Sequence, residues 1–190
     1  MDKAAVDNLN IKMQESQITC LLGHNGAGKS TTINMLTGLY PPSKGDCFIY
    51  GRRLSSELDT LRQRMSICPQ HSVLFADLSV AEHISFFTRI KGILPSKEYV
   101  QERATEVGLE EKLNAASKHL SGGMKRKLSI AIAFCGDPNF VLLDEVIMKG
   151  HSCTQRIPGG LCVHWSHLII LCLLLCLVIH GTLALIPLAY

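Results

Sequence analysis

The sequence predicts an α/β fold in which a parallel sheet carries a phosphate-binding loop. Residues 23–30 read Gly-His-Asn-Gly-Ala-Gly-Lys-Ser and match the template G-x-x-x-x-G-K-[ST]. The apolar run 18–22 before them is typical of a buried strand, and residues 31–38 after them show helical spacing that ends at a glycine. A second apolar run, 140–143, ends in two carboxylates. Two such strands with acidic or phosphate-binding residues at their ends indicate a P-loop core.

The residue types of this loop suit a nucleoside triphosphate such as ATP or GTP. Glycines let successive backbone N–H groups turn toward one point, and the helix that follows adds its unpaired N–H groups and the positive end of its dipole. Lys29 brings a mobile ammonium to the outer phosphates, and the Ser30 hydroxyl can bind Mg²⁺. The residues expected to bind the nucleotide here are Gly23, Asn25, Gly26, Gly28, Lys29, Ser30 and Thr31.

Length and composition limit the class of protein. A chain of 190 residues with 47% apolar residues suits one domain with an appendage. The net charge of +3 is too small to indicate a nucleic-acid surface. None of the eight cysteines forms a C-x-x-C pair, and no secretory signal is visible at residues 1–10. We therefore expect reduced thiols in the cytosol.

Turn and capping residues predict the elements between the two phosphate-related motifs. Alternation at residues 9–13 indicates a half-buried strand, and short strands are expected at 47–50 and 65–68 with a helix at 58–64. The capping box of Ser79 and Glu82 begins a helix that ends near Lys91. Ser96 begins another from residue 97 to about 107, ended by Gly108. These helices predict a helical subdomain, inserted at about 71–135.

Two further sets of residues are candidates for the same chemistry. Gln70 follows a short strand, so its amide can reach Mg²⁺ or water at the sheet edge where ligands bind. Ser121 caps a helix whose first turn carries Gly122 and Gly123, which makes a second anion site. Two phosphate sites in one small domain make sense only if the second serves another molecule's nucleotide.

The carboxylates at the end of the second apolar run complete the predicted site. The strand delivers Asp144 to the crevice, where it can hold Mg²⁺ through water, and Glu145 can polarise an attacking water as a general base. The predicted catalytic residues are Glu145 and Lys29, and the predicted metal ligands are Ser30, Gln70 and Asp144.

The order of these motifs resembles the nucleotide-binding domain of an ABC transporter. The phosphate loop, Gln70 as the Q-loop, residues 120–124 as the signature and residues 140–145 as the Walker B strand match, over residues 4–145. Residues 38–42, residues 68–75 and Met124 look like the A subfamily, large transporters that move lipids. The resemblance implies head-to-tail pairing, in which Ser121, Gly122 and Gly123 close over a partner domain's ATP. It also implies contact of the Gln70 region with transmembrane domains.

The sequence departs from this pattern after the Walker B strand. Residues 146–149 read Val-Ile-Met-Lys, where the family continues with Pro-Thr and an aspartate-containing D-loop. No switch histidine is assigned among His151, His164, His167 and His180, and no aromatic that stacks on adenine is found. We therefore expect residues 1–145 to be a partial ATP-binding domain, incomplete on its C-terminal side.

Residues 146–190 form an apolar tail without Asp or Glu. Residues 168–188 are a candidate transmembrane helix. Three interpretations remain open: an alternative-exon or gene-model product with no selected fold, a membrane anchor, or a core helix that replaces missing elements. A metal site of Cys162, His164 and His167 is rejected because the spacing fits no standard site.

The expected function is ATP binding and hydrolysis coupled to transmembrane transport, with lipid as the substrate class. The expected cofactors are ATP and Mg²⁺, and the expected location is the membrane, with the nucleotide-binding part in the cytoplasm. An alternative is a non-catalytic fragment that pairs with intact ABC domains. A soluble ABC protein of translation or DNA repair is disfavoured by the flanking residues and the lack of a basic surface.

Overall fold

The computed structural model describes residues 4–15, 18–144 and 169–175. These residues fall into two compact units. The first unit contains residues 4–15, 18–67, 139–144 and 169–175, and the second contains residues 68–138.

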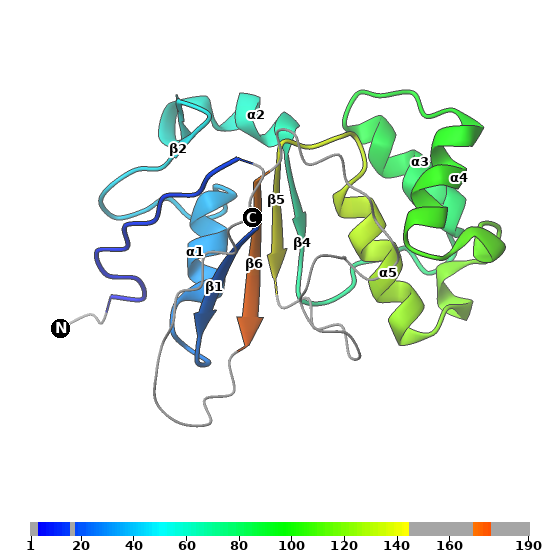
Figure 1. The fold of residues 1–190 in the computed structure, drawn as a ribbon, viewed down its shortest axis with the longest axis horizontal. Helices are drawn as coiled ribbons and strands as arrows, with labels where there is room; N and C mark the ends of the chain where they lie inside the picture. The colour runs from blue at the N-terminus through cyan, green and yellow to red at the C-terminus, as the bar shows by residue number, and fades with distance from the viewer. Residues whose placement is uncertain (1–3, 16–17, 145–168, 176–190) are drawn as a thin grey trace. The chain divides into compact units, whose positions relative to one another are not determined.

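A four-stranded sheet organises the first unit. Its strands stand in the order β1 (Ile18–Gly23), β6 (Ile169–Leu175), β5 (Phe140–Asp144) and β4 (Met65–Cys68). β6 runs parallel to both of its neighbours, and all four arrows point the same way in Figure 1. The carboxyl ends of β1 and β5 therefore lie at one edge of the sheet. This agrees with the parallel sheet that the two apolar runs predict.

Two helices and a small hairpin surround this sheet. α1 (Lys29–Leu36) packs against β1 and β5, and α2 (Leu54–Arg64) packs against the hairpin of β2 (Phe48–Ile49) and β3 (Arg52–Arg53). Tyr50 and Gly51 turn the hairpin with φ of 51° and 74°. The buried core is formed by apolar side chains of these elements: Ile33, Leu36, Ile49, Leu54, Leu61, Met65, Phe140 and Leu142.

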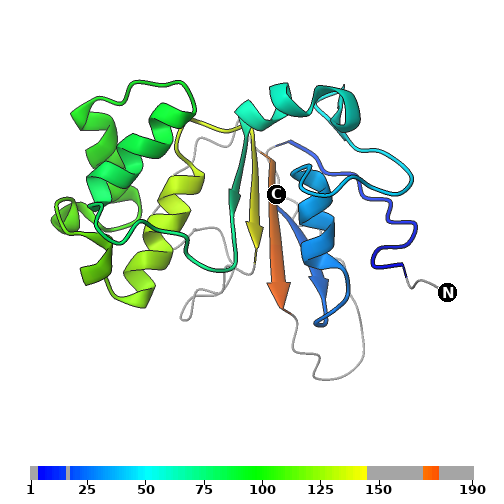
Figure 2. The same ribbon diagram turned by 180° about the vertical axis from the view of Figure 1, so that it is seen from behind.

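The second unit is helical, as the capping signals predict. α3 (Val80–Ile90), α4 (Lys97–Glu106) and α5 (Gly122–Ala133) pack against one another, with 3₁₀ turns η1 (Glu110–Lys112) and η2 (Ser117–His119) between α4 and α5 (Figures 1 and 2). Ser79 and Glu82 form the expected capping box. The side chains of Ser96 and Ser121 cap α4 and α5. Each helix thus begins where its hydroxyl side chain places it.

Some predicted elements differ in the structure. Residues 9–13 contain no strand, and Leu9 and Ile11 are exposed there. Three alternating apolar residues were too short a pattern to fix a strand that no neighbour pairs with. The predicted strand at 47–50 is only the two-residue β2, and α2 begins earlier than expected, with a kink at Glu57.

The helix expected over residues 168–188 is not found in the described part of that range. Residues 169–175 form strand β6 instead. A strand that is paired on both sides in a parallel sheet reads as a continuous apolar run, which periodicity cannot distinguish from a buried helix. The rest of the predicted helix lies outside the described residues. In the part of the chain that the structure describes, no helix is both long and apolar enough to cross a membrane.

The cysteines whose side chains the structure describes are free thiols: Cys20, Cys47, Cys68 and Cys135. Burial raises the pKa of the Cys135 thiol to about 11, and burial also raises the pKa of Cys47. Both thiols are therefore protonated at neutral pH and poor nucleophiles.

The central position of β6 makes a testable prediction. Proline has no N–H to donate, so Cys172→Pro removes a ladder hydrogen bond between paired strands. We expect the free energy of unfolding to fall by at least about 3 kcal/mol, measured by urea denaturation of the full chain. Lys97→Pro is the matched control, because the first residue of α4 tolerates proline. Equal urea midpoints for Cys172→Pro and wild type would exclude β6 from the sheet.

Candidate nucleotide-binding site

The turn between β1 and α1 has the bent backbone that the glycine pattern predicts. Gly26 and Gly28 have φ of 79° and 86°, in the left-handed region that favours glycine. The Ala27 N–H donates to the His24 carbonyl at 3.2 Å and closes the loop. The side of Gly26 is open, because a Cβ built there meets nothing within 4 Å. The loop can therefore present its backbone to a ligand without side chains in the way.

Lys29 lies across this turn. Its Nζ donates to the carbonyls of Gly23 at 2.7 Å and His24 at 3.0 Å, and the residue is only 7% exposed. A buried ammonium is stable only with such acceptors around it. The carbonyls hold the cation at the rim of the loop, where the outer phosphates of a bound nucleotide would be attracted to it.

The first turn of α1 is built to accept an anion. It contains no acidic residue, and Gly28 occupies the N-cap position without a side-chain cap. Thr32 faces inward and donates from Oγ1 to the Gly28 carbonyl at 3.0 Å, whereas Ser30 is exposed. A carboxylate or a capping side chain would compete with phosphate for these N–H groups. The Ser30 hydroxyl is available beside them for a cation.

The sheet register brings Asp144 to the same edge as this loop. Asp144 is level with Leu173 of β6, and Leu173 is level with Leu21 of β1, two residues before Gly23. Asp144 therefore lies two strand spacings from β1, about 10 Å across the sheet. Strand β6 lies between them, so Asp144 and the phosphate loop are at the same end of the sheet without being on adjacent strands. Glu145, the predicted general base, lies outside the described residues, as do the histidines from residue 151 onward.

The signature residues lie in the second unit, at the start of α5. The Ser121 Oγ accepts a hydrogen bond from the Met124 N–H at 3.3 Å, and the Ser121 carbonyl accepts one from the Lys125 N–H at 2.9 Å. Gly122 and Gly123 are exposed, and a Cβ built on either meets nothing within 4 Å. Among the residues that the structure describes, packing requires neither glycine. Their small size is explained if a ligand from outside approaches the backbone here.

Gln70 also belongs to the second unit, where it is exposed and follows Pro69 after the end of β4. The predicted residues are thus divided. The phosphate loop and Asp144 lie together in the first unit, while Gln70 and the signature residues lie in the second. In the described residues, no three His, Cys, Asp or Glu side chains gather into a metal-binding cluster. A cation held by Ser30 and Asp144 would need nucleotide phosphates to complete its ligands.

Sequence reasoning missed contacts between residues distant along the chain. The segment at Ala5 and Val6 lies against Gly28, so that a Cβ on Gly28 would be 2.4 Å from the Ala5 carbonyl oxygen. His83 is fully buried and bonded at both ring nitrogens. Arg126 donates to the Pro69 carbonyl. No local sequence pattern predicts such contacts. The exception is His83, whose place on the apolar face of α3 indicates a buried, hydrogen-bonded side chain.

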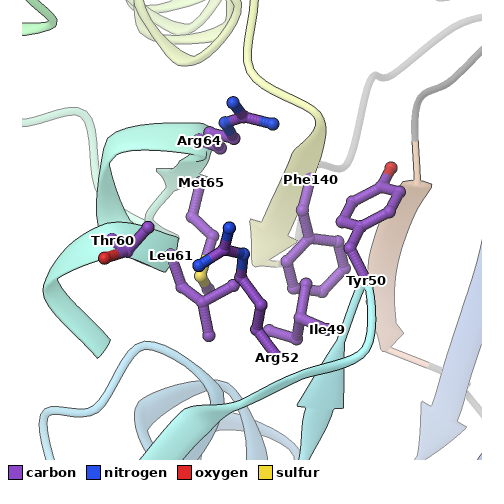
Figure 3. Close-up of a pocket in the computed structure, with 8 residues that line it drawn as sticks. All are labelled: Ile49, Tyr50, Arg52, Thr60, Leu61, Arg64, Met65 and Phe140. Atoms are coloured by element: carbon purple, nitrogen blue, oxygen red, sulfur yellow. The ribbon is translucent and has the colours of Figure 1, made fainter. Parts of the chain in front are cut away.

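A small cavity lies elsewhere in the first unit. Its volume is about 30 Å³, enough for roughly one water molecule and far too small for a nucleotide. It is formed by the β2–β3 hairpin, α2 and the first residues of β4 and β5, so it lies at the opposite end of the strands from the phosphate loop (Figure 3). The lining residues are Ile49, Tyr50, Arg52, Thr60, Leu61, Arg64, Met65 and Phe140.

Comparison with known proteins identifies the family. A model of the family described as ABC transporter matches residues 6–148. The chain belongs to the ABC transporter family. The resemblance that the motifs indicate is therefore confirmed. Domains of this family bind and hydrolyse ATP, typically with Mg²⁺, and work in pairs together with transmembrane domains.

Curated relatives refine the similarity of this ABC domain. The human phospholipid-transporting ATPase ABCA3 is 49% identical over 146 residues, which are 76% of this chain and 9% of that protein. The mouse retinal-specific phospholipid-transporting ATPase ABCA4 is 50% identical over 145 residues, 75% of this chain and 6% of that protein. The similarity to the A subfamily is thereby confirmed. The chain spans less than a tenth of the length of these relatives.

Solved structures confirm the fold of this ABC domain. A bacterial Atm1-family ABC exporter with ATP bound has a TM-score of 0.74 and 25% identity, over 87% of this chain and 30% of that chain. A dimeric ATP-binding cassette in a post-hydrolysis state, bound to ADP and Pi, has a TM-score of 0.72 over 90% of this chain and 79% of that chain. Its 23% identity supports the fold alone.

Two glycines of the loop offer a matched test of its geometry. Both have positive φ, so alanine strains either by about 1 kcal/mol. Only at Gly28 does the new Cβ also meet backbone, at 2.4 Å from the Ala5 oxygen. We expect Gly28→Ala to lower the free energy of unfolding by at least about 2 kcal/mol and Gly26→Ala by about 1 kcal/mol, measured by urea denaturation. Equal losses would show that the segment at Ala5 does not lie against the loop.

Proposed function

We propose that this chain is an ATP-binding domain of a lipid transporter of the ABC family. In this function, ATP binding and hydrolysis drive movement of lipid across a membrane. The observation that carries the proposal is the turn from β1 to α1, in which Lys29 is held over a glycine loop beside a helix start without acidic residues. The similarity to phospholipid-transporting ATPases supports lipid as the substrate class.

The phosphate loop would bind the nucleotide through its backbone N–H groups and the Lys29 ammonium. The N–H groups of the loop and of the first turn of α1 bind the phosphate oxygens, and the Lys29 ammonium moves from its carbonyl acceptors to the outer phosphates. Asn25 and Thr31 flank these groups in sequence. Charge that develops on the transferred phosphoryl group is stabilised by Lys29, which is already placed at the rim.

Mg²⁺ fits the oxygen donors at the sheet edge. Ser30 and Asp144 would hold it, with Gln70 as the third predicted ligand, and when bound it neutralises charge on the phosphates. Glu145 would accept the proton of the attacking water. Glu145 directly follows Asp144, the last residue of β5, in the sequence.

The signature residues and the Gln70 region each suggest a protein partner. Ser121, Gly122 and Gly123 would bind the nucleotide of a second ABC domain in a head-to-tail pair. This would explain why packing among the described residues requires neither glycine. The Gln70 region would contact transmembrane domains, so the chain would work at the cytoplasmic face of a membrane. The alternative, a non-catalytic fragment that pairs with intact domains, is favoured by one observation: Val146–Lys149 stand where the family has its aspartate-containing D-loop.

ATP binding by the full chain tests the proposal. Removal of the Lys29 ammonium deletes charge-assisted bonds, so Lys29→Ala should weaken binding of a fluorescent ATP analogue at least about tenfold. Lys44→Ala, in the exposed loop after α1, is the matched control and should bind like wild type. Equal binding by wild type and Lys29→Ala would refute the proposed site.

Turnover then separates the two candidate functions. Phosphate release is measured for the full chain and for Glu145→Gln. Turnover that Glu145→Gln reduces by at least about a hundredfold supports the ATPase, because the variant lacks the general base. ATP binding without turnover in either protein supports the non-catalytic alternative.

A further inference from the structure

The loop between β4 and α3 is held at its start by the signature helix. Arg126, in the second turn of α5, donates from its guanidinium to the carbonyl of Pro69, the residue before Gln70. Proline has no N–H, so this carbonyl is the only backbone group through which Pro69 can be bonded. A hydrogen bond from a charged, half-buried donor is among the stronger ones in a protein.

The same loop is held at its end by the residues that precede the signature. Ser117 is 2% exposed and donates from Oγ to the Phe75 carbonyl at 2.8 Å. Its N–H donates to the Leu78 carbonyl at 2.9 Å, and the Lys118 N–H donates to the Ala76 carbonyl at 3.0 Å. The turn η2, a few residues before Ser121, therefore fixes the backbone at the end of the loop.

Helix α3 completes this second attachment. The Phe75 N–H donates to Nε2 of His83 at 3.0 Å, and Nδ1 of His83 donates to the Ser79 carbonyl at 2.8 Å. Both backbone groups of Phe75 are thus bonded. Between the two attachments lies the Gln70 segment, residues 70–74, in which residues 70–73 are exposed and Val73 is 74% exposed.

We propose that Arg126 is a positioning residue for Gln70. The bond to Pro69 sets the direction in which the backbone enters the Gln70 segment, and the bonds of Ser117 set where it leaves. Arg126 and Ser117 flank Ser121, Gly122 and Gly123 in the sequence. The residues on both sides of the signature turn are therefore bonded to the loop that contains the Gln70 segment.

The inference rests on the proposed function only where it treats Ser121, Gly122 and Gly123 as nucleotide-binding residues. The attachment itself requires no nucleotide. Lys125 is the neighbour of Arg126 on α5, carries the same charge, and has no bond from its side chain to the loop among those found in the described residues. It therefore separates loss of charge from loss of the contact.

Limited proteolysis of the full chain with proteinase K, without nucleotide and followed by mapping of the cleavage sites, tests the proposal. In Arg126→Gln we expect cleavage within the Gln70 segment to be at least about tenfold faster than in wild type, while cleavage elsewhere in the second unit is unchanged. Arg126→Lys keeps a donor without the planar guanidinium, so its cleavage rate should be intermediate. Lys125→Gln should leave the segment at the wild-type rate.

The graded response of Arg126→Lys keeps the test valid if Arg126→Gln does not fold. Faster cleavage throughout the second unit, or wild-type cleavage of the Gln70 segment in both Arg126 variants, would overturn the positioning role. So would an equal effect of Lys125→Gln. None of these results depends on ATP binding, so failure of this inference and failure of the proposed function are read from different experiments.

Discussion

The structure depends on the burial of one cation in one turn. The ammonium of Lys29 is bonded to the carbonyls of Gly23 and His24, and this requires the backbone to leave β1, bend through left-handed glycines and enter α1 within a few residues. The same bend exposes the first N–H groups of α1 and packs Gly28 against the backbone at Ala5. The exposed N–H groups of the loop and its close approach to residue 5 are therefore consequences of a single local geometry.

The parallel sheet places an acidic residue at the same end as the phosphate loop. Asp144 reaches the same edge as the loop only because β1 and β5 are parallel and in register with the strand between them. The second unit is built on a different plan, in which hydroxyl caps begin each helix and hydrogen bonds from η2 and α5 hold the loop that contains Gln70. Lys29, Ser30 and Thr31 lie on α1, Asp144 ends β5, and Gly122 and Gly123 begin α5, whereas Asn25, Gly26 and Gln70 lie in the connecting loops.

Local chemistry explains what could be predicted from the sequence. Ser79 with Glu82, Ser96 and Ser121 fix helix starts, and Gly38 ends α1 with bonds from the Gly38 and Leu39 N–H groups to Met35 and Asn34. The phosphate loop and the two apolar strands around it were predictable for the same reason. Pairing between distant residues was not predictable: the place of β6, the contact of Ala5 with Gly28, and the bond from Arg126 to Pro69 depend on the whole fold. The alternation at residues 9–13 failed because strand formation needs a neighbouring strand.

The position of β6 has a consequence for biosynthesis. β1 leaves the ribosome well before β6, its neighbour in the sheet. At usual elongation rates, about 10–30 s separate the synthesis of Gly23 from that of Leu175. During that interval the paired edge of β1 is a bare row of N–H and C=O groups, open to association with other nascent chains. A chaperone that covers this edge until β6 emerges would therefore limit such association.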